Sequence, residues 1–523
     1  MNYADLFYAT MPVATLEVAA LLVLVVDLVF LRKAPLKTRV SVAAVLGIVG
    51  CGVAALMVPL ERVGLMDADD LNILGTGGSV AFLQISILLL TILTLLLLIE
   101  ARFTRHVGEY VSVVLMAASG GLIVVAAQDL LVIFIGLELM SLGLYILTAF
   151  DKSSGKSAEA ALKYYLFGGM SAAFLLFGFS YIYGLSGSTN LCWIGGQIAF
   201  AGSSPLLYVA WICIVAGLGF KVAAVPFHLW APDTYEGAPA PAAAFIASVS
   251  KVASFGLLLT FSSFWLMPGG AISGQRDVIE HLLKGFYSAW QPLAIILLIL
   301  APASMLVGNL AALAQVSVRR LLAYSAIAHA GYILLGVAVK PAYAGQSTAF
   351  HFLLDSYQGI GRTFIAVLYY VVTYGLTTIG AFGVVSVVER ATGSDRLDSF
   401  LGLHKRNPLL AAVLLVLFLS LAGIPPLVGF WAKFNLFAAV LGVSAGPIPF
   451  ALVALAVALS AVSLYYYLQV LKRAYVMPAI DETPIKAHPV TMAVLLFIAS
   501  AVVVLGCFPA LLQGWIQSFY PVL

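Results

Sequence analysis

Four lysines lie inside long apolar segments of this 523-residue chain, where a charged side chain is unusual. They are Lys163, Lys221, Lys251 and Lys433. An ammonium group in hydrocarbon costs at least about 2.5–3.5 kcal/mol on insertion scales, so such residues usually face a bundle interior or a water-filled path. Buried lysines also take part readily in proton exchange. The four lysines therefore indicate proton or ion movement, although Lys163 stands near the start of its segment and can alternatively extend to the membrane surface.

Glu138 supplies the opposite charge, near the middle of the apolar residues 131–141 (LVIFIGLELMS). A carboxylate there needs a cationic partner, and the candidates are Lys221 and Lys163. If such an ion pair opens and closes, the proton affinity of each partner changes, which is a physical basis for driving a proton along a chain. The alternative is a static buried pair that only locks helix packing, and such pairs are weak evidence for stability. We favour the transport role.

Two histidines and two further carboxylates accompany these residues. His329, in residues 323–332 (AYSAIAHAGY), titrates near neutral pH and either extends a relay between the two halves of the chain or is a hydrogen-bonded core residue. His228 stands just beyond Pro226, where irregular backbone can hold water. Glu17 and Asp27 lie near opposite ends of the first apolar segment, and they face either a neighbouring subunit or the lipid headgroups.

The composition excludes a soluble globular protein. The chain is 63% apolar and 9% charged, with a mean hydropathy of +1.08, whereas soluble domains are about 25% charged. It has no basic run, no glycine-rich phosphate loop and no Cys/His cluster with metal-ligand spacing, so soluble-enzyme chemistry has no support. No Lys or Arg precedes Arg32, so the first apolar segment does not resemble a secretory signal and is expected to be retained. The four cysteines are isolated and are expected to be small core residues: Cys51, Cys192, Cys213 and Cys507.

Fourteen apolar stretches are long enough to span a membrane as helices of about 20 residues. We therefore predict an all-α polytopic membrane protein with about 14 transmembrane helices. The stretches are residues 12–31, 40–60, 79–99, 110–128, 130–150, 161–184, 206–226, 240–266, 289–312, 321–339, 363–388, 408–439, 449–471 and 491–516.

The basic residues orient these helices. Of the 26 Lys and Arg, seventeen follow odd-numbered stretches, five follow even-numbered ones, and the four lysines named above lie within stretches. By the positive-inside rule the odd-numbered loops face the cytoplasm, which places both termini outside.

Proline interrupts two of the stretches, and each interruption accompanies a buried lysine. Residues 217–228 (GLGFKVAAVPFH) contain Lys221, and residues 422–434 (AGIPPLVGFWAKF) contain Lys433. Proline removes a backbone hydrogen bond and clashes with the preceding turn, so helices 7 and 12 are predicted to be discontinuous. Unpaired carbonyls at such breaks can hold water or an ion.

The two breaks occupy matching positions in two five-helix units. We predict two inverted repeats, because an odd number of helices per unit turns the second unit over, as in proton and ion translocators. The polar stretch 340–358 has no counterpart in the first half. The predicted boundaries are 1–109 for helices 1–3, 110–266 for the first repeat (helices 4–8), 289–471 for the second repeat (helices 9–13) and 491–523 for helix 14.

The sequence resembles the antiporter-like membrane subunits of respiratory complex I, the proton-pumping NADH:quinone oxidoreductase, and among them most closely the subunit N family. The most specific motif is residues 220–239 (FKVAAVPFHLWAPDTYEGAP). Subunits L and M, and the multisubunit cation/proton antiporters, look similar here but typically carry a His-Thr-Glu-type sequence at residues 234–237. Subunit M also typically has Glu at the position of Lys433, and the 340–358 stretch is longer than in the family.

The resemblance implies proton translocation outward across a bacterial cytoplasmic (inner) membrane, driven by quinone reduction elsewhere in the complex. It implies a translocase subunit with no redox cofactor or NADH site of its own, because NADH, FMN, iron–sulfur clusters and quinone belong to partner subunits. Its neighbours would be other antiporter-like membrane subunits. A multisubunit secondary cation/proton antiporter and a passive scaffold are the alternatives. The residues that match the family's proton relay are Glu138, Lys163, Lys221, Lys251, His329 and Lys433.

Overall fold

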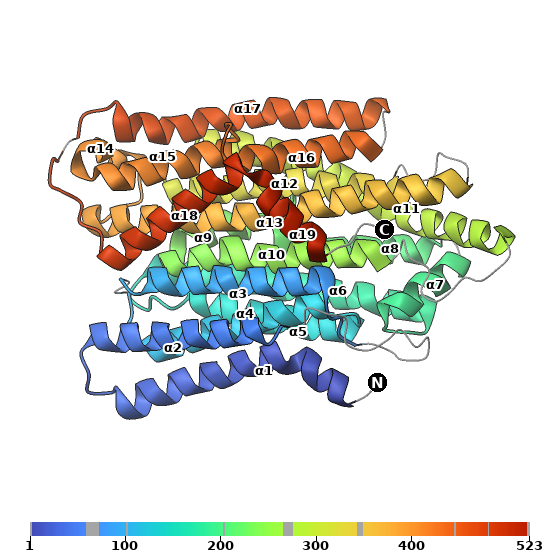
Figure 1. The fold of residues 1–523 in the computed structure, drawn as a ribbon, viewed down its shortest axis with the longest axis horizontal. Helices are drawn as coiled ribbons and strands as arrows, with labels where there is room; N and C mark the ends of the chain where they lie inside the picture. Colours follow the sequence, from blue (N-terminus) through green and yellow to red (C-terminus); the bar gives the residue numbers. More distant parts are fainter. Residues whose placement is uncertain are drawn as a thin grey trace.

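The computed structural model describes residues 3–58, 73–100, 103–201, 204–264, 276–342, 349–443, 446–479 and 481–519. Within these residues the secondary structure is helical apart from three isolated β-bridges. Most helices run side by side along the long axis of the molecule, with the N-terminal α1 at one edge and α17 at the other (Figure 1). The α-helices are α1 Tyr3–Val25, α2 Leu36–Leu56, α3 Gly78–Leu98, α4 Val107–Ala126, α5 Leu130–Thr148, α6 Gly155–Ser186, α7 Leu191–Ala201, α8 Pro205–Val222, α9 Trp230–Gly237, α10 Ala240–Phe264, α11 Arg276–Leu313, α12 Val318–Ala342, α13 Ala349–Thr392, α14 Leu403–Arg406, α15 Pro408–Ala422, α16 Val428–Val443, α17 Pro447–Tyr475, α18 Pro489–Cys507 and α19 Pro509–Phe519.

The helices account for the predicted membrane crossings. Thirteen helical segments of the described part are long and apolar enough to span a bilayer. The predicted twelfth crossing is shared between α15 and α16, each too short to cross alone. In hydrocarbon every backbone polar group needs an internal partner, and continuous helices provide it. The prediction of an all-α polytopic membrane protein is confirmed.

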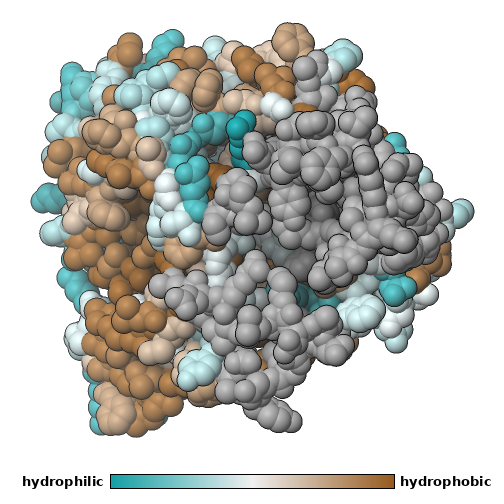
Figure 2. Space-filling model, turned by 45° about the vertical axis from the view of Figure 1, so that its right-hand side comes forward, coloured by the Kyte–Doolittle hydropathy of each residue, from teal (hydrophilic) through white to brown (hydrophobic). Residues whose placement is uncertain are grey.

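Burial separates the outer helices from the central ones. Large apolar side chains such as Phe177, Ile299 and Phe497 are exposed on the outside, and a broad apolar surface faces outward in Figure 2. By contrast, all residues in the most apolar stretch of α10, and 94% of those in the corresponding stretch of α12, are buried within the protein. Lys251 on α10 and His329 on α12 therefore lie in the centre of the bundle, where lipid does not reach them.

The first break follows α8, which ends at Val222. Ala223 takes a left-handed conformation with φ of 60°, and Ala224 N–H donates to the carbonyl of Gly219 at 2.8 Å, which closes the helix end. The peptide bond before Pro226 is cis. Beyond it, the chain continues into the short helix α9.

The second break, between α15 and α16, is built in the same way. Gly423 is left-handed with φ of 88°, Ile424 N–H donates to the carbonyl of Leu419 at 3.1 Å, and the peptide bond before Pro426 is cis. Both helices predicted to be discontinuous are interrupted where proline predicts it. The inverted-repeat relation and the four domain boundaries remain predictions.

Three segments differ from the predicted boundaries. The predicted last crossing 491–516 divides at Phe508 into α18 and α19, because Pro509 has no N–H to continue the first helix and starts the second. The short helix α7 was not predicted, since its 11 residues are too few to span a membrane. The polar stretch 340–358 is largely helical backbone, in which α12 continues to Ala342 and α13 begins at Ala349; residues 343–348 lie outside the described part.

Asp27 corrects an expectation. It faces neither the lipid headgroups nor a neighbouring subunit, because it is buried inside the protein at 1% exposure. Arg39 of α2 donates to it through Nε, 2.7 Å from Oδ1, and through Nη2, 2.5 Å from Oδ2. Asp27 also accepts from the backbone N–H of Gly108 on α4 at 3.1 Å. Spacing along one helix did not reveal this, because the partner comes from the following helix. Asp27, in the π-helical segment Val26–Phe30 that continues α1, thus ties the end of the first helix to α2 and α4.

Candidate functional site

Glu138 of α5 and Lys221 of α8 face each other in the first half of the bundle. Their nearest charged atoms, Glu138 Oε1 and Lys221 Nζ, are 3.9 Å apart, and Lys221 Nζ donates a hydrogen bond to Ser141 Oγ. Lys221 is buried, at 5% exposure, at the C-terminal end of α8, which favours a cation. Of the two candidate partners for Glu138, the structure selects Lys221. The ammonium is bound by the serine while the carboxylate stands at the edge of ion-pair distance.

Lys251 occupies the middle of α10 and is 2% exposed. Its Nζ donates to the backbone carbonyl of Ala326 on α12 at 2.6 Å. The same nitrogen lies 5.6 Å from the centre of the Tyr374 ring on α13, a distance at which a cation is attracted to the ring face. Lys251 of α10 therefore contacts α12 and α13, two helices of the predicted second repeat.

His329 lies beyond Tyr374, on α12, and is 4% exposed. Its ring centre is 4.8 Å from that of Tyr374, so one tyrosine touches both Lys251 and His329. The imidazole Nδ1 is 2.8 Å from the hydroxyl of Tyr370, and Nε2 is 3.5 Å from the hydroxyl of Tyr467. Both ring nitrogens thus have hydroxyl partners, which can exchange a proton with the imidazole.

Lys433 of α16 is held by the second break. Its Nζ donates to the carbonyls of Ala422 at 2.8 Å and Leu421 at 3.1 Å, and to Ser460 Oγ at 2.8 Å. The two carbonyls belong to the last turn of α15, which the break leaves without intrahelical partners. The interruption of the helix therefore creates the ammonium site. Lys433 is 6% exposed.

Tyr332 connects Lys433 to His329. Lys433 Nζ is 5.6 Å from the centre of the Tyr332 ring, and that ring is 5.8 Å from the imidazole. Lys251, Tyr374, His329, Tyr332 and Lys433 therefore form one continuous row of side chains through the second half. The sequence predicted the charged members of this row. Tyr332 follows His329 by three residues, a spacing that places both side chains on one face of a helix. Nothing in the sequence marked Tyr374, because aromatic residues are common at core positions of membrane helices.

Lys163 lies in a different environment. Its Nζ is 2.7 Å from Asp233 of α9 and 2.7 Å from Glu159, and its side chain is 40% exposed. Arg320 joins the same group through Asp233 at 2.7 Å and Glu236 at 3.0 Å. We call these residues, with Lys156 bound to Glu236 at 2.9 Å, the ionic cluster. It joins α6 and α9 to α12.

Two carboxylates of the ionic cluster, those of Asp233 and Glu236, are held in the charged form. Partial burial alone would raise the pKa of Asp233, but hydrogen bonds from Lys163 and Arg320 hold that pKa below its ordinary value. In Glu236 the same opposition, with Lys156 and Arg320 as donors, also leaves the pKa lowered. Of the predicted relay residues, the structure brings Glu138 to Lys221 and aligns Lys251, His329 and Lys433. It places Lys163 in the ionic cluster instead.

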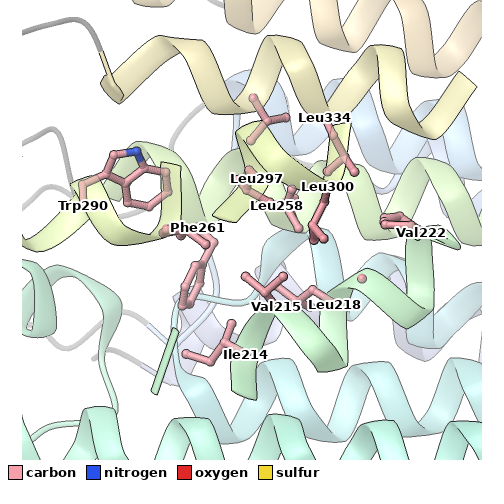
Figure 3. Close-up of a pocket in the computed structure, with 14 residues that line it drawn as sticks. Ile214, Val215, Leu218, Val222, Leu258, Phe261, Trp290, Leu297, Leu300 and Leu334 are labelled. Carbon is pink, nitrogen blue, oxygen red and sulfur yellow. The ribbon is translucent and has the colours of Figure 1, made fainter. Parts of the chain in front are cut away.

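A small cavity lies beside the first break, between α8, α10, α11 and α12 (Figure 3). Its volume is ≈ 20 Å³, and the side chains around it are apolar, among them Leu218, Leu258, Leu297 and Leu334. Apolar cavities of about this size stay dry. The cavity therefore offers no polar path of its own.

Comparisons with known proteins agree with this geometry. The family profile described as NADH:quinone oxidoreductase/Mrp antiporter, TM, matches residues 127–273, 279–361 and 356–460. NADH-quinone oxidoreductase subunit N 2 of Acidobacterium capsulatum is 46% identical over 526 residues, with 99% of each chain covered.

Two solved structures share the fold. A chain of respiratory complex I from Thermus thermophilus with bound aureothin is 31% identical, with a TM-score of 0.73 and coverage of 96% of this chain and 99% of that chain. A chain of the Mrp complex from Dietzia sp. DQ12-45-1b has a TM-score of 0.75 at 20% identity, with 99% and 98% coverage, and so shares the fold alone. The chain belongs to the NADH:quinone oxidoreductase/Mrp antiporter family of transmembrane proteins.

Proposed function

We propose that this chain is the N-type membrane subunit of a proton-pumping NADH:quinone oxidoreductase, and that it moves protons through its buried Lys, Glu and His residues. The observation that carries the proposal is the continuous row from Lys251 through His329 to Lys433, with the Glu138/Lys221 pair in the other half. Full-length similarity to a subunit N chain supports the same assembly.

The chemistry follows from the contacts. Opening or closing of the Glu138/Lys221 pair changes the field at Lys251, because an opposite charge favours a protonated lysine and its neutralisation disfavours it. A proton released by Lys251 passes along the hydroxyl and imidazole groups around His329 to Lys433. His329 suits this position because an imidazole can accept a proton at one ring nitrogen and donate one from the other. Lys163 takes part through the ionic cluster, which lies outside the row from Lys251 to Lys433.

The direction and setting complete the proposal. The distribution of Lys and Arg supports an orientation with both termini outside the bacterial cytoplasmic membrane. The similarity to subunit N supports proton movement from cytoplasm to outside. Other antiporter-like subunits would be the membrane neighbours. NADH, FMN, iron–sulfur clusters and quinone would be bound by partner subunits, so this chain would contribute translocation and no redox step.

Lys251→Ala tests the proposed function. Removal of the central ammonium interrupts the row, so proton pumping by membrane vesicles that contain the assembled complex should be abolished. Lys472→Ala, an exposed lysine at the end of α17, is the matched control and should pump normally. Pumping by the Lys251→Ala complex at the rate of that control would refute the relay.

A secondary cation/proton antiporter is the other candidate, because the Mrp fold is shared. Gentle purification separates the two. Flavin-containing and iron–sulfur partners that co-purify with the chain support the oxidoreductase, whereas only small membrane partners support the antiporter. A passive scaffold predicts that Lys433→Ala lowers the amount of assembled complex and leaves pumping by the surviving complex intact.

A further inference from the structure

Three side chains of α5 form a polar row on one face of an otherwise apolar helix. Glu138, Ser141 and Tyr145 are spaced three and four residues apart, so they lie one above another. Ser141 Oγ accepts the hydrogen bond of Lys221 Nζ. Tyr145 lies one further turn along, towards the end of α5 at Thr148, which the distribution of Lys and Arg places on the cytoplasmic side.

The Tyr145 hydroxyl is buried in an unusual way. The residue is 7% exposed, and its Oη makes no hydrogen bond of good geometry within the described part, although Ser141 is within its reach. A buried hydroxyl without a partner costs about 1–3 kcal/mol, so its retention calls for a reason. Room for it comes from Gly168 of α6, where a Cβ would overlap the hydroxyl.

The other side of Tyr145 leads to the ionic cluster. Its ring packs against Tyr164 of α6 with centres 4.8 Å apart. Tyr164 stacks on Trp230 of α9 at 4.3 Å and an interplanar angle of 7°. Trp230 begins the helix that carries Asp233, the partner of Lys163. Two aromatic rings, those of Tyr164 and Trp230, therefore connect Tyr145 to the helix that carries this part of the ionic cluster.

We propose that the hydroxyls of Tyr145 and Ser141 carry protons between the ionic-cluster side of the protein and the Glu138/Lys221 pair. A hydroxyl can accept one proton and donate another, so each transfer leaves it unchanged. In the inward direction, the Ser141 hydroxyl, which donates to the Leu137 carbonyl, turns towards a neutral Lys221 and gives up its proton. Ser141 then takes the Tyr145 proton, and Tyr145 takes one from water at the cytoplasmic side. This access path rests on the proposed function and extends it, since it supplies the first pair with protons along α5.

Tyr145→Phe is the direct test, in the full complex in membrane vesicles. It keeps the ring that packs on Tyr164 and removes only the hydroxyl. Loss of a proton-transfer group should slow pumping at least about tenfold and increase the solvent deuterium effect on the pumping rate. Tyr110→Phe is the matched control, because the Tyr110 hydroxyl on α4 is also buried without a partner but lies outside the polar row. It should pump at the wild-type rate.

Two adjacent glycines give an independent test that leaves every polar group in place. Gly168→Ala pushes the Tyr145 hydroxyl aside and should slow pumping, whereas Gly169→Ala meets nothing within 4 Å and should not. Tyr145→Phe and Gly168→Ala complexes that pump at the rates of their controls, with unchanged deuterium effects, would overturn the access path. Lys251→Ala keeps the two proposals apart, because a silent Tyr145→Phe beside an inactive Lys251→Ala removes the access path and leaves the proposed function standing.

Discussion

At Gly423, the addition of a single methyl group should impair proton pumping while the fold is retained. This glycine is left-handed, with φ of 88°, at the end of α15. A Cβ at this glycine would lie 3.0 Å from Lys433 Cδ and 3.2 Å from Nζ, closer than ordinary van der Waals contact. The Gly423→Ala substitution therefore strains the backbone and also displaces the ammonium by a few tenths of an ångström.

Two costs can be worked out from these distances. Left-handed backbone costs an L-residue about 1–2 kcal/mol, which lowers the stability of the complex. Displacement of Lys433 weakens its bonds to Ala422 O at 2.8 Å and Ser460 Oγ at 2.8 Å. A hydrogen bond to a charged group contributes about 1.5–3 kcal/mol, so loss of one alters the balance of charged and neutral lysine by about tenfold or more. Pumping should fall by a similar factor.

Gly393→Ala is the matched control. Gly393 is also left-handed, with φ of 75°, but a Cβ there meets nothing within 4 Å. Both variants should lose similar thermal stability, and only Gly423→Ala should lose pumping, measured as protons moved per NADH oxidised in membrane vesicles. Equal pumping by the two variants would show that the position of Lys433 against the break does not matter, and the reasoning would fail.

Further predictions concern charges outside the lysine row. The pKa of Asp233 is below its ordinary value of 3.8, so its charged form stabilises the folded chain above that pH, and this stability is lost as the pH falls through the lowered pKa. Thermal unfolding should therefore show Asp233→Asn to be less stable than wild type by at most about 1 kcal/mol between about pH 5 and 8. This difference in stability should shrink below about pH 4. A difference that grows on acidification would contradict the assignment. Arg39→Leu leaves the Asp27 carboxylate buried and should destabilise the chain by about 3 kcal/mol, read from its thermal unfolding, whereas Lys33→Leu, at an exposed position, should change little.

The sequence by itself determined the class of protein and its charged residues. Apolar stretches of about 20 residues can only be helices in lipid, because there the backbone must satisfy its own hydrogen bonds, so the crossings were predictable one by one. Proline predicted both interruptions, after Val222 and after Ala422, since its ring and missing N–H are local properties. Glu138 and the four lysines within apolar stretches stood out for the same reason, as charges in apolar segments.

Only the tertiary structure decided which of these residues meet. Glu138 had two candidate partners, and the placement of α5 and α8, which both pack against α6, chose Lys221, while α9 folded back to bind Lys163 through Asp233. Asp27 found Arg39 on the next helix. Tyr374 became a link between Lys251 and His329 because α13 lies beside α10 and α12. Tyr332 follows His329 by three residues on α12, but its contact with Lys433 depends on the packing of α16 against α12. Local sequence fixes the cost of burying a group, but the partner that offsets this cost comes from another helix, and only the fold determines which one.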